Sequence, residues 1–398
     1  MRNQQFIIYT VLLLSVTLSM TFGQSRFDTL TRALQRVYQR DSLPGLSVVL
    51  VNQKKIIYQH SFGYANIEKQ IKYNTRSIQT IGSVSKTFAA IALMKAVELG
   101  YFDLDTDINT ILPFRVVNPN APNSQITVRQ LANHTSGIVD NPSIFYDTYQ
   151  FDTTLAAYSP VAYAKLKKLG FNQQINDCSL PRFMYDYLSE NGQYYTKQNF
   201  GSDAPGRSSS YSNIGSALAA YLVEVKSGIS YADFTRRYIL RPLRMRQSSW
   251  FLDVKRLKRY ARPYDDHFLS LPYYHQITYP DGGLRTNTSD LGKYLISLLQ
   301  GYQGGEKLLK RVSYTTMFTP QFSHESPPKG IRLTTRNKGI FWNLYVNGTI
   351  GHDGDDPGVS SFLFFNPRTG LGGVFLSNKY IVDKKSLTDL LIHFTDTR

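Results

Sequence analysis

The chain has 398 residues, of which 42% are hydrophobic and 13% are aromatic, so it can bury a large core. This composition excludes a disordered or fibrous protein and indicates a globular one. The formal charge of +16 favours contact with anionic surfaces such as cell-wall polymers, although a solvated basic surface without a dedicated partner explains it too. Nucleic acid is not expected as a partner, because the basic residues are scattered along the chain.

Residues 1–23 have the pattern of a secretory signal peptide. Arg2 precedes an apolar run at 6–18, and small residues follow at the spacing of a signal-peptidase site. We predict cleavage after Gly23 and a periplasmic or secreted bacterial protein, with an uncleaved N-terminal anchor as the alternative. The run is shorter than a membrane span needs, so no stable span is expected after cleavage. Cys178 is the only cysteine, which suits an exported bacterial protein without disulfides.

The first elements expected after the signal are a helix and a β-hairpin. Helical spacing covers 27–40, and strands at 46–51 and 56–60 are joined by a polar turn. The hairpin comes just before the next helix in the sequence. We therefore expect it to form part of the sheet on which that helix packs.

Ser83 and Lys86 open the helix that follows, which the apolar spacing extends to Gly100. Residues three apart share a helix face, so Lys86 can reach the Ser83 hydroxyl, and its neutral amine can accept the hydroxyl proton. Free N–H groups at the helix start can face a developing oxyanion. A serine N-cap with an exposed lysine explains the pair equally well, and the same pattern at 326–329 is interrupted by prolines.

The middle of the chain predicts helices around a polar, aromatic segment. His134 ends the first helix, and we interpret it as a structural residue rather than a catalytic one. The segment 139–206 is rich in Tyr, Phe and Asn, and we expect it to form a cap that shapes the pocket. Helices are expected at 127–133, 160–169, 180–188, 214–226 and 231–240, and from Thr288 or Ser289 to 299.

The last third returns to strands, at 339–346, 349–352, 360–365 and 372–377, with a closing helix at 386–394. Strands at both ends with helices between them imply an α/β (α+β) fold, in which one sheet is assembled from distant parts of the chain and carries a helical lobe. We predict one domain, 24–398. Its sheet lobe covers about 24–105 and 275–398, and its helical lobe covers about 106–274.

Three motifs follow one another along the chain: Ser83-x-x-Lys86, Tyr211-x-Asn213 and His352-Asp353-Gly354. With them the sequence resembles the serine β-lactamase and penicillin-binding-protein superfamily, in the branch of class C β-lactamases, D-Ala-D-Ala carboxypeptidases and related esterases. The resemblance covers nearly all of the mature chain and implies a β-lactamase-like fold with a central antiparallel sheet flanked by helices. Further matching segments are 63–65, 131–137, 242–245 and 281–285.

The resemblance implies that Ser83 is acylated, that Lys86 and Tyr211 manage its proton, and that Asn213 orients the substrate or Lys86. It places the oxyanion hole at the backbone N–H groups of Ser83 and Asp355. No metal or other cofactor is implied, and a zinc site is unsupported because one histidine and no cysteine lie near the motifs. The absence of Gly-x-Ser-x-Gly argues against an ordinary α/β-hydrolase.

The third motif departs from the family pattern where it would orient the substrate. His352 stands where β-lactamases carry lysine, and Asp353, Asp355 and Asp356 flank Gly354 where relatives that bind a substrate carboxylate present hydroxyls. Because like charges repel, we expect penicillins and free D-Ala-D-Ala ends to be poor substrates. In the alternative interpretation, the aspartates point outward and cap the turn at 356–358.

The expected function is that of an exported serine hydrolase, which cleaves a small-molecule or peptide ester or amide through a Ser83 acyl-enzyme. A D-Ala-D-Ala carboxypeptidase or β-lactamase is the alternative within the same class. A penicillin-binding-like sensor or binding protein, acylated without turnover, is the alternative from another class. Steady turnover of a chromogenic short-chain ester separates the enzyme from the sensor, which would give a single burst.

Overall fold

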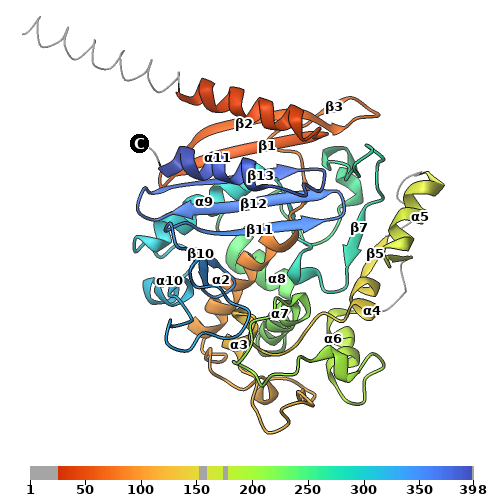
Figure 1. The fold of residues 1–398 in the computed structure, drawn as a ribbon, viewed down its shortest axis with the longest axis vertical. Helices are drawn as coiled ribbons and strands as arrows, with labels where there is room; N and C mark the ends of the chain where they lie inside the picture. The colour runs from red at the N-terminus through yellow and green to blue at the C-terminus, as the bar shows by residue number, and fades with distance from the viewer. Residues whose placement is uncertain (1–25, 152–158, 174–177, 397–398) are drawn as a thin grey trace, which may run out of the picture.

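A computed structural model describes residues 26–151, 159–173 and 178–396, so the predicted signal peptide lies outside the described residues. Its centre is an eight-stranded antiparallel sheet with the order β3-β2-β1-β13-β12-β11-β10-β9 (Figure 1). The strands are β1 (Gly45–Asn52), β2 (Ile56–Asn66), β3 (Ile71–Lys72), β9 (Arg336–Lys338), β10 (Asn343–Tyr345), β11 (Ile350–Asp356), β12 (Val359–Asn366) and β13 (Leu371–Ser377).

The two halves of the sheet are joined by pairing between strands from the two ends of the chain. Strand β1 is antiparallel to β13, in a register that runs from Leu46 opposite Ser377 to Asn52 opposite Leu371. The hairpin β1–β2 supplies one side of the sheet and the last third of the chain supplies the other. The structure thus confirms the expected mixed α/β fold with one sheet built from both chain ends.

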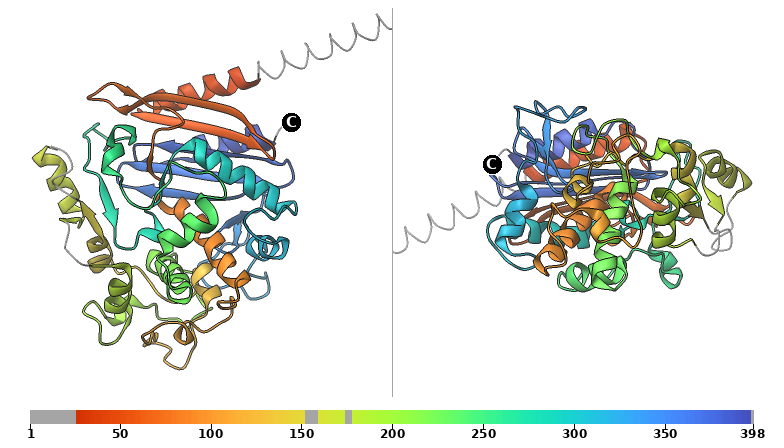
Figure 2. Two further views of the ribbon diagram at one scale, coloured as in Figure 1. Left: turned by 180° about the vertical axis from the view of Figure 1, so that it is seen from behind. Right: turned by 90° about the horizontal axis from the view of Figure 1, so that it is seen from below.

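Side chains on alternate sides of the strands bury two hydrophobic clusters, as the two-residue period of a strand requires. Val48 and Leu50 face the helix at 26–40 and α11 (Lys385–Asp396). Val49 faces the larger cluster, which includes α2 (Ser85–Glu98) and α9 (Thr288–Tyr302). Viewed from below, the two terminal helices lie on one face of the sheet and the other helices on the opposite face (Figure 2).

Helix α2 runs through the interior, where residues 85–94 are all buried, and it approaches solvent only in its last turn. The chain between α2 and α9 forms further helices and, together with β4, which precedes α2, two small sheets, β4–β8 and β6–β5–β7. These elements are β4 (Gln79–Thr80), α3 (Val128–Ala132), α4 (Pro142–Phe145), β5 (Tyr149–Phe151), α5 (Pro160–Lys168), β6 (Asn172–Gln173), α6 (Leu180–Leu188), α7 (Asn213–Ser227), α8 (Tyr231–Thr235), β7 (Tyr274–Gln276) and β8 (Arg285–Thr286); α10 (Arg311–Phe318) follows α9.

The single strand predicted at 339–346 is wrong, because the chain turns between β9 and β10. Phe341 has a φ of 57°, which a strand residue does not adopt, and its buried ring packs in the core. Its N–H donates to the Ala132 carbonyl at 2.9 Å instead of to a neighbouring strand. The tertiary contact with the end of α3 therefore outweighs the strand propensity of the segment.

Three smaller expectations also need correction. Strand β11 continues four residues beyond the predicted end at 352, which brings the third motif into the sheet. The predicted helix 231–240 changes to a π-helix at Arg236–Leu240, and the N-cap of α9 is Asn287. Within the described part of the chain, no helix is long and apolar enough to cross a membrane. The division into two lobes stays a prediction.

Candidate active site

Ser83 lies in a 3₁₀ turn, η1 (Gly82–Val84), which leads directly into α2. Lys86 follows one turn later, and its Nζ lies 3.1 Å from Ser83 Oγ. The structure thus brings the Ser-x-x-Lys pair into contact, as the three-residue spacing predicts. The alternative interpretation, in which Ser83 only caps the helix and Lys86 is exposed, is wrong, because Lys86 is 0% exposed.

Burial determines the chemistry of Lys86. Its Nζ donates to Asn213 Oδ1 at 2.6 Å and to the Asp281 carbonyl at 2.7 Å. Burial lowers the pKa of Lys86, and the negative charges of Asp281 and Asp140 oppose this shift. A neutral amine has two N–H groups, which these two oxygen atoms accept. Its lone pair then faces the Ser83 hydroxyl, in the arrangement that a proton acceptor requires.

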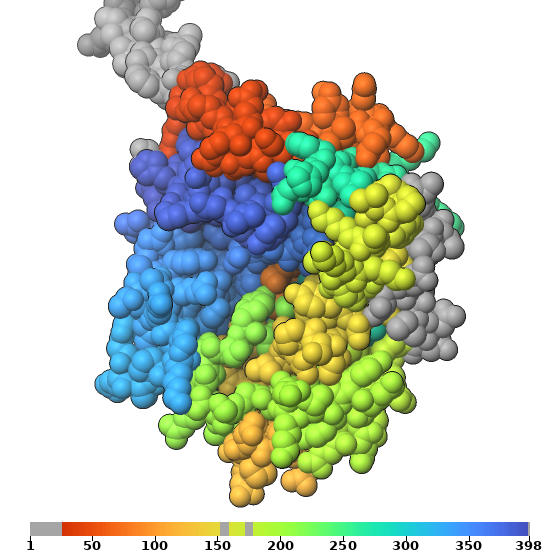
Figure 3. Space-filling view, turned by 45° about the vertical axis from the view of Figure 1, so that its right-hand side comes forward, coloured from red at the N-terminus to blue at the C-terminus, as the bar shows by residue number. Residues whose placement is uncertain are grey.

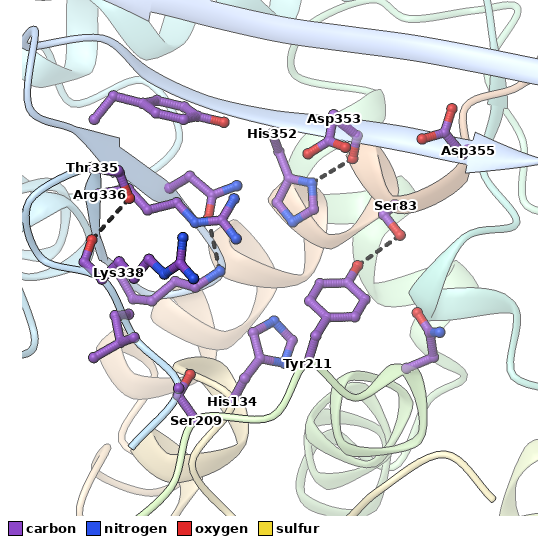
Figure 4. Close-up of a pocket in the computed structure, with 16 residues that line it drawn as sticks. Ser83, His134, Ser209, Tyr211, Thr335, Arg336, Lys338, His352, Asp353 and Asp355 are labelled. Carbon is purple, nitrogen blue, oxygen red and sulfur yellow. Dashed lines mark hydrogen bonds between the residues drawn. The ribbon is translucent and has the colours of Figure 1, made fainter. Parts of the chain in front are cut away.

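Tyr211 reaches the same hydroxyl from the segment before α7. Its Oη donates to Ser83 Oγ at 2.7 Å (Figure 4). Removal of its hydroxyl from water raises the pKa of Tyr211 well above its ordinary value, and the Ser83 contact opposes this only in part. Tyr211 is therefore neutral at pH 7, although one side of its ring is exposed to the cavity. A hydrogen-bond chain runs from Tyr211 through Ser83 to Lys86.

His134 supports Tyr211 from the end of α3. Its ring centroid lies 4.5 Å from that of Tyr211, and its Nδ1 accepts the Ser212 N–H at 3.3 Å. Burial lowers the pKa of His134 well below 6.5, and nearby Lys338 and Lys86 lower it further. These contacts agree with the structural role that the sequence favours, and the ring also forms part of the cavity wall.

Gly354 allows β11 to pass against η1. A Cβ at Gly354 would lie 2.2 Å from the Ile81 carbonyl oxygen and 2.9 Å from Ser83 N, so no larger residue fits without movement. A Cβ at Gly82 would likewise lie 2.7 Å from Asp355 N. Two close backbone contacts therefore place the N–H groups of Ser83 and Asp355 in one small region, as an oxyanion hole needs.

His352 and Asp353 precede Gly354 at this edge. Burial lowers the pKa of His352 to about 4, against the opposing effect of Asp353, so the ring is neutral at pH 7. Its Nδ1 lies 2.6 Å from the Asp353 carbonyl oxygen, which can only accept, so Nδ1 carries the proton. Burial alone would raise the pKa of Asp353, but Lys384 and His352 outweigh it and lower the pKa.

The three aspartates of β11 do not act as one group. Lys384 Nζ donates to Asp355 at 2.5 Å and to Asp353 at 3.4 Å. Asp356 is buried on the other side of the strand, where it accepts from Tyr149 Oη at 2.8 Å. Only Asp353 and Asp355 line the cavity, and a lysine neutralises part of their charge. The expectation of acidic residues beside Ser83 therefore holds for Asp353 and Asp355 and is wrong for Asp356, which is buried and is not an outward turn cap.

A cavity of about 840 Å³ opens beside Ser83, in the hollow between the blue C-terminal residues and the green segment (Figure 3). Arg336 and Lys338 lie on the side away from Ser83 (Figure 4), and Arg332 also lines the cavity. Burial and nearby Arg336 lower the pKa of Lys338 to about 8. The lining residues are Ser83, His134, Ser209, Tyr211, Asn213, Gly330, Ile331, Arg332, Thr335, Arg336, Lys338, Asn343, Tyr345, His352, Asp353 and Asp355.

The aromatic segment lies elsewhere than expected. No described residue between 139 and 206, a range from which 152–158 and 174–177 are left out, lines the Ser83 cavity, so the described part of this segment does not shape it as predicted. Tyr146, Tyr149 and Phe171 instead line a second cavity of about 610 Å³, which shares only Asp355 with the first. The rings pack on β7 through Tyr274 and on each other, because β5 pairs with β7 rather than with the central sheet.

Sequence reasoning missed five charged residues around the site: Asp140, Arg332, Arg336, Lys338 and Lys384. Arg336 and Lys338 lie two residues apart on β9, a pattern too short to recognise in a basic chain. Lys384 directly precedes α11, about 30 residues after its partners. Asp140 comes three residues after the segment 131–137 that resembles the family, and this proximity is the signal by which Asp140 could have been found.

The fold and the Ser83–Lys86–Tyr211 contacts are those of a protein of the β-lactamase type. The family model described as Beta-lactamase matches residues 30–392, and the chain belongs to that family. Penicillin-binding protein 4* of Bacillus subtilis (strain 168) is 26% identical over 81% of this chain, and protein flp of Staphylococcus aureus (strain MRSA252) is 24% identical over 89%. The chain spans 66% and 63% of the length of these two relatives.

Solved structures share the fold. An octameric penicillin-binding protein homologue from Pyrococcus abyssi aligns with a TM-score of 0.70 at 23% identity, over 88% of this chain and 73% of its own. A class C β-lactamase aligns with a TM-score of 0.68 at 20% identity, over 94% of this chain and 96% of its own. The family match confirms the expected superfamily, and the solved structures confirm its β-lactamase-like fold.

Proposed function

We propose that the protein is an exported serine hydrolase that cleaves an ester or amide through a Ser83 acyl-enzyme. The observation that carries this proposal is the hydrogen-bond chain from Tyr211 through Ser83 Oγ to the buried amine of Lys86. This chain connects the nucleophile Ser83 with a proton acceptor, Lys86, one helical turn later and with a proton donor, the Tyr211 hydroxyl.

In the proposed reaction, Lys86 takes the Ser83 proton as Oγ attacks the carbonyl carbon. The oxyanion that forms is held by the N–H groups of Ser83 and Asp355. Tyr211 gives its proton to the leaving group and regains one from the protonated Lys86, so the site ends this step neutral. Water then attacks the acyl-enzyme carbonyl and gives a proton to Lys86 or Tyr211. The carboxylic acid product leaves, and the same pair returns a proton to Ser83.

We infer that the substrate has no carboxylate beside β11. Lys384 is the cation at this edge, and Asp353 and Asp355 already bind it. A substrate carboxylate placed here would meet two negative charges and no free positive one. His352 is neutral at pH 7 and offsets none of this repulsion. An ester or an amide that is uncharged at this position suits the site better.

A D-Ala-D-Ala carboxypeptidase or β-lactamase remains the second candidate, because the far side of the cavity is basic. Arg332, Arg336 and Lys338 line it, and Lys338 Nζ donates to the neutral Asn343 Oδ1 at 2.7 Å rather than to a carboxylate. A leaving group with a negative charge on that side would find cationic partners there. A substrate panel decides between the two candidates.

The panel compares short-chain esters, D-amino-acid amides, D-Ala-D-Ala peptides and β-lactams on the wild type and on Ser83→Ala. We expect steady turnover of esters or uncharged amides that is lost in Ser83→Ala. A single stoichiometric burst would instead support a sensor that is acylated without turnover. Rapid hydrolysis of a cephalosporin, lost in the same variant, would overturn the inference about the carboxylate.

Export is tested by the mature N-terminus. We propose a periplasmic or secreted protein, and N-terminal sequencing of protein from those fractions should begin at Gln24. A chain that retains Met1 and sediments with the membranes would support the uncleaved anchor. Contact with an anionic cell-wall surface also stays a prediction, and co-sedimentation with cell-wall polymer at low and high salt tests it.

A further inference from the structure

Asp140 lies beside the N-terminus of α7 and outside the three motifs. Its Oδ1 accepts from Ser212 Oγ at 3.0 Å and from Ile214 N at 2.9 Å. Its Oδ2 accepts from the backbone N and from the side-chain Nδ2 of Asn213, both at 2.9 Å. One carboxylate therefore holds three consecutive residues, directly after Tyr211.

The helix start explains why a carboxylate suits this place. Helix α7 has 15 residues, and its first N–H groups have no partner within the helix. Ser212 Oγ accepts from Gly215 N at 2.9 Å, while Asp140 accepts from Asn213 N and Ile214 N. Bonds to an ionised acceptor are stronger than neutral ones, and the positive end of the helix dipole adds to them.

The same contacts determine which way the Asn213 amide points. An ionised carboxylate only accepts hydrogen bonds, so the Asn213 NH₂ group must face Asp140. The amide oxygen is then left for Lys86, and Oδ1 lies 2.6 Å from Nζ. The reversed amide would place its oxygen against the carboxylate and its N–H groups against Lys86. Asp140 thus selects one of two amide orientations that have nearly the same shape.

We propose that Asp140 is a positioning residue, which holds the Asn213 amide in the orientation that directs Lys86 Nζ at Ser83. This inference rests on the proposed function. In neutral Lys86, the Asn213 and Asp281 oxygens take the two N–H groups, and the lone pair faces Ser83 Oγ at 3.1 Å. With the amide reversed, the Asn213 NH₂ would donate to the lone pair of Lys86 Nζ. The lone pair would then not be available to accept the Ser83 proton.

The test is Asp140→Asn, which keeps the size of the side chain but gives it an NH₂ group. We expect kcat/KM for a chromogenic short-chain ester to fall about 10- to 100-fold, the range for a lost bond to a charged group. In an Asn213→Ala background, the same change should cost less than twofold, because the amide that transmits the effect is absent. Asp140→Glu should recover part of the activity.

A pH profile separates positioning from a loss of stability. Asp140 favours the protonated form of Lys86, so its removal should move the acid limb of kcat/KM to lower pH. The matched control is Asp186→Asn, which removes a buried carboxylate that accepts from Arg182 at 2.6 Å on α6. This control should lower the Tm and leave both kcat/KM and the acid limb unchanged.

Activity of Asp140→Asn within twofold of the wild type would overturn the proposal, as would an equal loss in the Asn213→Ala background. If Asp140→Asn does not fold, Asp140→Ser in both backgrounds carries the same comparison, because it too removes the carboxylate. The rate at which an aryl fluorophosphonate labels Ser83 keeps this test separate from the proposed function. If the wild type hydrolyses no ester or amide, the proposed function fails, whereas slower labelling of the Asp140 variants would still support positioning.

Discussion

The Lys384 ammonium lies 2.5 Å from the Asp355 carboxylate, at the strand edge whose backbone approaches Ser83. Removing this cation by Lys384→Met leaves Asp353 and Asp355 uncompensated beside the cavity. We expect kcat/KM for anionic esters to fall at least about tenfold relative to neutral esters of the same acyl group, because unscreened like charges repel. Added salt should reduce the difference.

The control for Lys384→Met is Lys385→Met, which removes the next lysine along the chain. Lys385 is exposed and pairs with Asp389 on α11 instead of with β11. It should leave the ratio between anionic and neutral esters unchanged. Equal effects of the two variants would contradict a local role for Lys384.

Lys86→Met tests the base without changing the size of the side chain much. We expect kcat/KM to fall by about 10² to 10⁴, the usual contribution of a positioned proton acceptor. The Tm should stay equal or rise, because a buried amine is replaced by an apolar group. Thermal melts and ester hydrolysis on one preparation check both parts. A variant that keeps activity would remove Lys86 from the mechanism.

Gly354→Ala tests the close contact between β11 and η1. The added Cβ would lie 2.2 Å from the Ile81 carbonyl oxygen, so the strand must move away from Ser83. We expect kcat to fall about 10²-fold or more, as when one oxyanion-hole donor is lost. In Gly201→Ala, the matched control, the nearest atom lies at 3.7 Å, so its activity should stay unchanged. A fully active Gly354→Ala would show that the contact is not needed.

Stability should respond to pH through Asp356. Burial raises the pKa of Asp356 to about 7, and that of Asp281 to about 6, above the ordinary 3.8. The folded state therefore binds these protons more tightly than the unfolded state. The stability that they contribute is complete below about pH 4 and is lost as the pH rises to about 7.

Asp356→Asn removes one of these titrations and still accepts the Tyr149 hydroxyl. Relative to the wild type, we expect the variant to gain stability between pH 5 and 8, on the order of 2 kcal/mol. Urea unfolding at several pH values measures the gain. Asp389→Asn, at an exposed position, should show no such trend. A deficit that grows with pH would contradict the sign of the effect.

Local patterns predicted the parts of the site that depend on local geometry. The contact between Lys86 and Ser83 follows from helix spacing, whereas the pairing of Tyr211 with Ser83 is implied by the resemblance to the family. The helix predicted at 180–188 matches α6, because its apolar positions recur at helical spacing. The sheet could be predicted because runs of strand-forming residues occur near both ends of the chain.

The charges around the site could not be predicted, because each reaches it through tertiary contacts. Asp140 meets Asn213 only once the segment after α3 passes the start of α7. Lys384 meets Asp355 only once α11 packs on the sheet. The turn at Phe341 depends on a hydrogen bond to the end of α3, which no pattern in its own segment encodes.

The pairing of the first strand with the last has a consequence for when activity can appear during synthesis. Ser83 and Lys86 leave the ribosome early, but in the sheet β11 is joined to β1 only through β12 and β13, of which β13 pairs with β1. A nascent chain that lacks residues 350–377 therefore contains the nucleophile Ser83 but lacks the Asp355 N–H, the second donor proposed for the oxyanion. We expect such fragments to be inactive, so that hydrolysis begins only after almost the whole chain has been translated.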